Sequence, residues 1–247
     1  MIDLRPSRRS ALARFARELD AQDVRVCAAP DLAGVSRADR DAAFLGWAGR
    51  IVDEQGSVAA FTELLAHLVA LEAPYAALAT VHRIIGDELR HVRLCAEVAS
   101  WFGDLETLEI DLSGLELPAP REGRAARALE IVVRALVVGE SESLLMLRAY
   151  RDASTDASVL TAYQVLLYDE ARHAAAGRHL DALLREWLPA EALAPFAARE
   201  AQVREADRAH MRAAHLDAAR GGPGRAFGVS ITEAEARAAI ERTDLAA

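Results

Sequence analysis

The chain has 247 residues and a formal net charge of −9. This negative balance argues against nucleic-acid binding, which requires a basic surface. The two cysteines, Cys27 and Cys95, are too few for a disulfide framework. No apolar run has the length of a membrane span, and no apolar stretch follows the first arginines. We therefore expect a cytoplasmic protein with no membrane partner.

Apolar residues recur at helical spacing along nearly the whole sequence, which predicts an all-α fold. A short leading helix is expected over residues 7–19. Ser36 can cap a long helix over residues 37–71, and Pro74 suits the first turn of a helix that ends near residue 102. The first half of the chain therefore predicts two long helices joined by a tight turn.

The stretch from residue 103 to residue 123 has a different character. Acidic residues alternate with Leu and Ile there, and Pro118 and Pro120 follow. A link of this length is uncommon inside a compact domain unless it travels the length of the fold. We therefore expect one long crossover connection, with the helices before and after it running parallel.

The second half repeats the pattern of the first. A helix over residues 124–151, a short turn and an antiparallel helix over residues 157–187 are expected. Beyond Pro189 we expect a fifth helix, a break at residues 221–224 and a final helix that Thr232 and Glu235 begin as a capping box. We expect a single domain over residues 1–247, with a core bundle at about 37–187 and a helical extension at 190–247 packed on it.

The pentapeptide Asp-Glu-x-Arg-His occurs twice, at residues 87–91 and 169–173. Helix positions i and i+3 project from the same face, so each copy offers one carboxylate and one imidazole to a common point. A single Glu-x-x-His is weak support for a metal site. Two copies with the same four residue types, each placed similarly after a short turn, are hard to attribute to chance.

The helix before each pentapeptide should supply a further carboxylate. In an antiparallel pair, the partner lies as far before the turn as the motif lies after it. In the second half this reasoning selects Glu140, with Glu142 as the reserve. In the first half it favours Glu54 over Glu63.

The sequence thus predicts a metal site made of six side chains, four of them anionic, which suits two hard-to-borderline cations. These are Glu54, Glu88, His91, Glu140, Glu170 and His173. Four uncompensated carboxylates inside an apolar bundle would be costly, and two bound cations would remove that cost.

The Asp and Arg residues that the two copies share have an expected supporting role. A ligating imidazole usually donates its second N–H to a carboxylate. We expect Asp87 and Asp169 each to accept from the His of the opposite copy, and Arg90 and Arg172 to neutralise these two Asp side chains.

The repeated Asp-Glu-x-Arg-His, with a preceding Glu in each half, resembles the ferritin-like di-iron carboxylate superfamily. It is similar in style to rubrerythrins, bacterial multicomponent monooxygenases and acyl-carrier desaturases, and the likeness covers about residues 37–187. The resemblance implies a ferritin-like four-helix bundle with one long crossover connection, here with additional N- and C-terminal helices.

The resemblance also implies a pair of iron ions, with manganese or a mixed pair as alternatives. Glu88 and Glu170 would bridge the ions; Glu54 and His91 would complete one side, and Glu140 and His173 the other. The implied function is a di-iron oxidase or oxygenase that activates O2 to oxidise a small organic substrate and takes electrons from an external donor. Four apolar residues are expected to flank the substrate cavity: Ile51, Ile84, Val137 and Leu166.

Two other functions stay open, and so does a homodimeric state. A ferroxidase or iron-handling protein is one, although no rubredoxin-like Cys pair is present; a non-catalytic helical bundle is the other. Tyr163, Trp47 and Cys95 lie on or near the ligand faces, but core packing is the favoured interpretation of each.

Overall fold

The structure, a computed structural model, describes residues 29–107 and 123–244. The leading helix expected over residues 7–19 and most of the link after residue 103 lie outside this part. All regular secondary structure in the described residues is helical, which confirms the all-α prediction.

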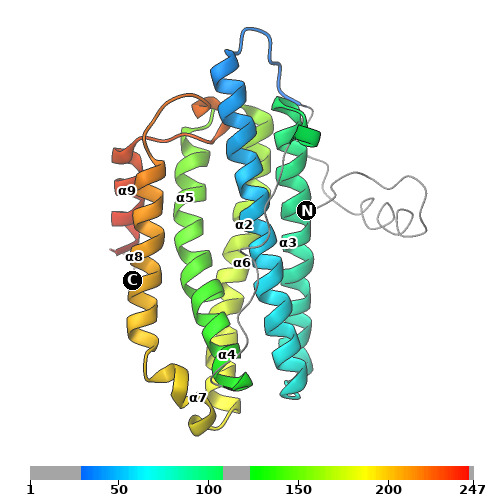
Figure 1. Cartoon of the computed structure of the whole chain (residues 1–247), viewed down its shortest axis with the longest axis vertical. Helices are drawn as coiled ribbons and strands as arrows, with labels where there is room; N and C mark the ends of the chain where they lie inside the picture. The colour runs from blue at the N-terminus through cyan, green and yellow to red at the C-terminus, as the bar shows by residue number, and fades with distance from the viewer. Residues whose placement is uncertain (1–28, 108–122, 245–247) are drawn as a thin grey trace, which may run out of the picture.

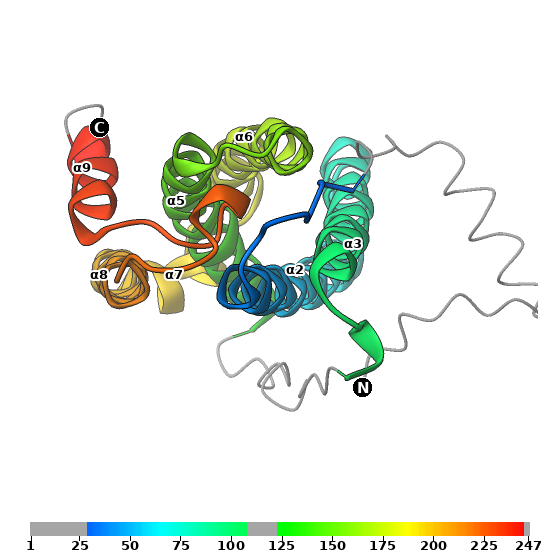
Figure 2. The same ribbon diagram turned by 90° about the horizontal axis from the view of Figure 1, so that it is seen from above.

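Four long helical columns make the bundle (Figures 1 and 2). They are α2 (Arg37–Ala70), α3 (Tyr75–Phe102), α6 (Ala157–Trp187) and a column formed by α4 (Arg124–Ile131), η3 (Val132–Gly139) and α5 (Glu140–Ala153). A short 3-10 turn, η1 (Leu105–Thr107), follows α3. Figure 1 shows α3 and the α4–α5 column running in the same direction, as expected for a bundle with one crossover.

The helices begin where polar side chains accept from the free backbone N–H groups of the first turn. Ser36 caps α2, since its hydroxyl accepts from the Asp39 N–H at 3.1 Å. Asp156 caps α6 by accepting from two backbone N–H groups of its first turn, both at 3.0 Å. The predicted cap at Ser36 is therefore confirmed.

The apolar core of the bundle falls into two large clusters with a polar layer between them, and a third, smaller cluster joins α5 to the C-terminal extension. Along α2, Ile51 belongs to one cluster and Phe61 to the other; along α3, Val92 and Ile84 divide in the same way. Glu54 and Glu88 lie between these pairs in the sequence. The fold thus places acidic side chains at mid-height of the bundle, where they lose most of their hydration.

The third column departs from the sequence prediction. A continuous α-helix was expected over residues 124–151, but Val132–Gly139 is a π-helix. The backbone N–H of Glu140 donates to the Ala135 carbonyl, five residues back. Side-chain periodicity does not reveal such a segment within an apolar run. Because π-helical turns are common at functional sites and this one ends at Glu140, it sets the direction of that carboxylate.

Helix α6 approaches η3 very closely at Gly177. A Cβ added there would lie 2.6 Å from the Leu136 Cβ and 2.9 Å from the Leu136 carbonyl carbon.

We predict that Gly177→Ala lowers the free energy of unfolding by about 1–3 kcal/mol through overpacking. Gly86→Ala on α3 is the matched control, because its added Cβ meets nothing within 4 Å. It should stabilise by about 0.5–1 kcal/mol through helix propensity. Denaturant unfolding of both variants measures the contrast; equal effects would contradict it.

The C-terminal extension packs on the bundle, as expected. It contains α7 (Ala190–Ala197), α8 (Glu200–Ala218), η4 (Arg225–Phe227) and α9 (Glu233–Asp244). The single helix predicted beyond Pro189 is wrong, because the chain turns between α7 and α8 at residues 198–199. α8 lies against η3 and α5, and α9 against α5. The capping box is confirmed, since the Thr232 N–H donates to Glu235 at 2.9 Å and the Glu235 N–H donates to Thr232 at 3.3 Å.

Within the described part of the chain, no helix combines the length and apolarity that a membrane crossing requires.

Candidate metal centre

The structure brings together all six side chains that the sequence analysis selected. They form two groups whose possible ligand atoms lie within 4.8 Å of one another. One group is Glu54, Glu88, His91 and Glu170; the other is Glu88, Glu140, Glu170 and His173. Glu88 and Glu170 belong to both groups. Each of these groups could hold a metal ion, and the Glu88 and Glu170 carboxylates would be available to both groups.

The two imidazoles face the cluster with the same ring nitrogen. His91 Nδ1 lies 3.2 Å from Glu170 Oε1, 3.4 Å from Glu54 Oε2 and 3.6 Å from Glu88 Oε2. His173 Nδ1 lies 3.0 Å from Glu88 Oε1, 3.1 Å from Glu170 Oε2 and 4.0 Å from Glu140 Oε1. The structure is therefore pseudo-symmetric, with equivalent atoms of the two pentapeptides directed at one region.

The cluster is buried and its polar atoms are incompletely satisfied. Glu88 is 1% exposed and His91 is fully buried. Among the described residues, both carboxylate oxygens of Glu88 and Nδ1 of His91 lack a hydrogen-bond partner, although other polar atoms lie near them. Unsatisfied polar atoms are rare in protein interiors and are costly. Oxygen and nitrogen lone pairs directed at a common point, without donors, fit the requirement of a cation.

The Asp and Arg residues of the pentapeptides make crossed contacts behind the imidazoles. His91 Nε2 lies 3.3 Å from Asp169, and His173 Nε2 lies 3.4 Å from Asp87, so each His meets the Asp of the opposite copy. Arg90 donates to Asp169 at 2.6 Å and to Asp87 at 2.8 Å.

Arg172 completes this layer by donating to Asp169 at 3.0 Å. Carboxylates in these positions hold the Nε2–H tautomer and leave Nδ1 free to bind a metal. That supporting role stays a prediction, and the contacts are those it requires.

The carboxylates and imidazoles shift one another's pKa values strongly. Burial raises the pKa of Glu54 to about 8 and raises that of Glu140 well above its ordinary value, with the charge of Glu170 adding to the latter. Burial opposes ionisation of Glu170, but hydrogen bonds with His173 and His91 hold its pKa low. Burial also opposes protonation of His173, yet its carboxylate partners raise its pKa to about 11. Protons compensate the negative charge here, and a bound cation would displace them.

The two reserve ligands lie elsewhere in the structure. Glu63 accepts from Arg127 at 2.9 and 3.0 Å, and it lies 3.1 Å from His67. Glu142 accepts from Arg212 of α8 at 2.9 and 3.0 Å. Each has cationic partners, so neither is available to the cluster.

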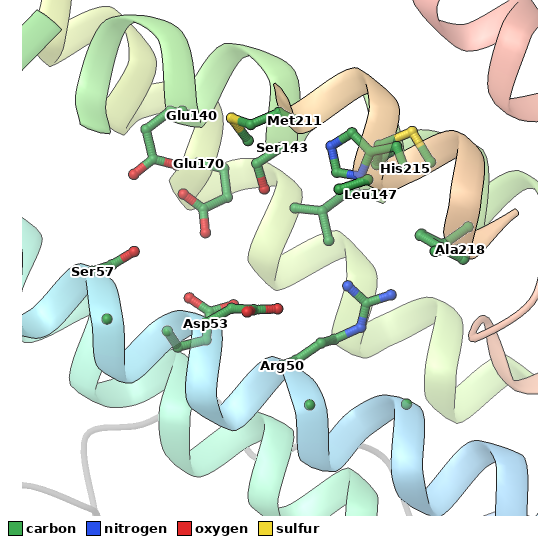
Figure 3. Close-up of a pocket in the computed structure, with 18 of the residues that line it drawn as sticks. Arg50, Asp53, Ser57, Glu140, Ser143, Leu147, Glu170, Met211, His215 and Ala218 are labelled. Atoms are coloured by element: carbon green, nitrogen blue, oxygen red, sulfur yellow. The ribbon is translucent and has the colours of Figure 1, made fainter. Parts of the chain in front are cut away.

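A cavity of about 780 Å³ opens beside the cluster, between α2, the η3–α5 column and α8. Glu54, Glu140 and Glu170 form part of its wall. Figure 3 shows Glu140 and Glu170 at one end of this space and Arg50 and His215 at the other. This volume is that of a small-molecule site.

The prediction that four apolar residues flank the cavity is wrong. Ile51, Ile84, Val137 and Leu166 do not line it, since they pack within the two core clusters. All four pack inside the four-helix bundle. Because α8 covers one side of the bundle, the cavity forms beneath α8 instead, with apolar walls that include Met146, Leu147 and Met211.

Trp47, Tyr163 and Cys95, which the sequence favours as core side chains, lie in the core. Trp47 and Tyr163 are fully buried with ring centroids 5.2 Å apart, and the Trp47 indole N–H donates to the Phe227 carbonyl at 3.0 Å. The Tyr163 hydroxyl donates to the Gly228 carbonyl. Cys95 is buried and forms no disulfide within the part of the chain that the structure describes.

Two cavity residues, Arg50 and His215, were not selected from the sequence. Arg50 lies one helical turn before Glu54, and that spacing was the one available signal. His215 carries no signal, because the helix that presents it is far along the chain from the pentapeptides.

The fold and the site define a class of protein, an all-α bundle with a buried carboxylate–histidine cluster that can bind metal. No known protein family, no curated protein and no solved structure matches this chain.

Proposed function

We propose that this protein binds two iron ions in the cluster and activates O2 to oxidise a small organic substrate, as a ferritin-like di-iron oxidase or oxygenase. Manganese or a mixed pair is the alternative metal content. The proposal includes an external electron donor and a cytoplasmic location.

One observation carries the proposal. Two overlapping groups of carboxylates and imidazoles share Glu88 and Glu170, and the cluster borders a cavity of ligand size. Four carboxylates and two imidazoles suit two iron or manganese ions better than one. A single ion would leave some of these buried charges uncompensated.

Bound iron would supply the redox chemistry that O2 reduction needs. If one oxygen atom enters the substrate and the other leaves as water, two electrons and two protons must come from a donor outside the chain. The protein's own part is to orient the imidazoles through Asp87 and Asp169, to exclude water and to hold the substrate beside Glu54, Glu140 and Glu170.

The cavity favours substrate oxidation over simple iron handling. Iron storage needs a path for ions rather than a chamber of about 780 Å³ with largely apolar walls. A ferroxidase would consume O2 with Fe(II) alone and form a large assembly. A non-catalytic bundle would bind no iron.

Anaerobic titration with Fe(II), followed by exposure to O2, tests the proposal. Two irons per chain and O2 uptake, with Mössbauer spectra of a coupled di-ferric pair afterwards, are the expected results. Failure to bind added Fe(II) would overturn the proposal and leave the non-catalytic bundle.

We also predict that metal loading stabilises the fold. A ligand that binds only the folded state at 100 times its dissociation constant contributes about 2.7 kcal/mol. For a chain of this size, each kcal/mol shifts the midpoint of thermal unfolding by about 2–4 °C. Iron-loaded protein should therefore unfold about 5–10 °C above chelator-treated protein in a calorimetric scan under argon. Identical midpoints would contradict a buried site.

A further inference from the structure

The end of the cavity away from the cluster contains a partly buried cation. Arg50 of α2 lies between three aromatic rings, with its guanidinium carbon 4.9 Å from the Tyr150 centroid, 5.2 Å from that of Trp47 and 5.3 Å from that of Tyr163. These rings hold the guanidinium plane in place and favour its charged form. Burial opposes the charge, but the neighbouring groups, Asp53 included, raise the pKa of Arg50 above its ordinary value.

The hydrogen-bonding capacity of Arg50 is largely unused. One terminal nitrogen donates to the Tyr163 hydroxyl at 2.6 Å and to the Gly228 carbonyl at 3.4 Å. The Nε–H has no partner within the described residues. None of the ion pairs in that part of the chain includes Arg50, and Asp53 acts on it only at longer range. A partly buried guanidinium without a bound carboxylate carries a desolvation cost that an anionic ligand would offset.

His215 of α8 lines the same end of the cavity and also has an unused polar atom. Its Nε2 is buried and has no hydrogen-bond partner within the described residues. Burial, with a smaller effect of the Arg50 charge, lowers the pKa of His215 to about 4, so the ring is neutral at pH 7. As the Nε2–H tautomer, a neutral imidazole donates one hydrogen bond without adding a second charge. Figure 3 shows Arg50 and His215 reaching toward the cavity from opposite walls.

Between these donors and the metal cluster the cavity wall has aliphatic side chains and two polar residues, Asp53 and Ser143. Met146, Leu147, Met211 and Ala214 are among the apolar residues that line the cavity. Arg50 and Glu54 are four residues apart on one helix, about 6 Å along its axis. A ligand with its acidic group at Arg50 would therefore place an apolar body against this wall and extend toward the cluster.

From this arrangement we infer that the substrate is an organic monocarboxylate with an apolar body, and that Arg50 and His215 bind its carboxylate. The planar guanidinium can donate two parallel hydrogen bonds to a carboxylate, a geometry that favours this anion over a neutral alcohol. That this acid is the substrate rests on the proposed function. That the cavity binds such an acid does not depend on the proposed function.

A purely structural role for Arg50 is the competing account. In that case it only ties the loop after η4 to Tyr163, and the cavity shows no preference for acids. The two accounts differ in ligand selectivity, which can be measured on metal-free protein, so that no carboxylate can bind through a metal ion.

The experiment titrates chelator-treated, full-length protein with octanoate and with 1-octanol, following Trp fluorescence and binding heat. The wild type should bind octanoate about tenfold or more tightly than octanol, since hydrogen bonds to charged groups are strong. Arg50→Gln should weaken octanoate binding about tenfold and leave octanol binding unchanged. Arg37→Gln is the matched control, because Arg37 is on the same helix with a side chain 90% exposed; it should bind like the wild type.

Equal affinities for octanoate and octanol in the wild type would overturn the inference, and that comparison needs no variant. Octanoate binding unchanged by Arg50→Gln would overturn it as well. Iron titration of the same samples separates the two proposals: acid binding without iron binding contradicts the di-iron function alone, and iron binding without acid selectivity contradicts this inference alone.

Discussion

Glu170→Gln should abolish stable binding of both irons. Glu170 belongs to both groups of the cluster, so its loss removes a ligand from each ion. Glutamine keeps the shape of the side chain and can still accept from the imidazoles, but it lacks the charge that compensates a cation. Iron content after anaerobic loading and desalting should fall from two per chain to nearly none.

Glu186→Gln is the control for this experiment. Glu186 lies on the same helix but is exposed, away from the cluster. It should retain two irons per chain, and circular dichroism should show both variants folded. Wild-type iron content in Glu170→Gln would mean that the metal binds elsewhere.

Asp169→Asn should weaken iron binding about 10–100-fold while leaving the six ligands in place, as expected for the hydrogen-bonding partner of a ligating His. Asp169 contacts His91 and accepts from Arg90 and Arg172. Burial opposes its ionisation, yet hydrogen bonds to His91 and Arg90 lower its pKa to about 2. It is therefore a full negative charge at neutral pH, and the amide would remove that charge.

Competition with a chelator of known affinity measures the change. Asp181→Asn is the matched control, because Asp181 is also on α6 but pairs with Arg185 at 2.8 Å on the surface. An affinity for iron that is equal in Asp169→Asn and Asp181→Asn would show that the Asp–His contact does not support the site.

Much of this arrangement could be predicted because the key pattern is local and repeated. The i, i+3 spacing places Glu88 with His91, and Glu170 with His173, whatever the details of packing. Antiparallel pairing then relates each pentapeptide to the preceding helix, which selects Glu54 over Glu63. The structure places Glu54 in the cluster and gives Glu63 to Arg127.

The remaining features depend on interactions between distant parts of the chain. The π-helical turn before Glu140 follows from packing of an apolar run against α6, where Gly177 permits a close approach. Arg50 and His215 meet the same cavity only because α8 folds back over α5. Helical periodicity in a single segment carries no information about such contacts between distant segments.

In the proposed function, the buried carboxylates and imidazoles hold a pair of iron ions. Anomalous diffraction at the iron edge from crystals of the loaded protein tests it most directly. Two peaks are expected roughly 3.5–4 Å apart, between the Glu88 and Glu170 carboxylates and next to Nδ1 of His91 and of His173. A single peak, or peaks only at the protein surface, would contradict it.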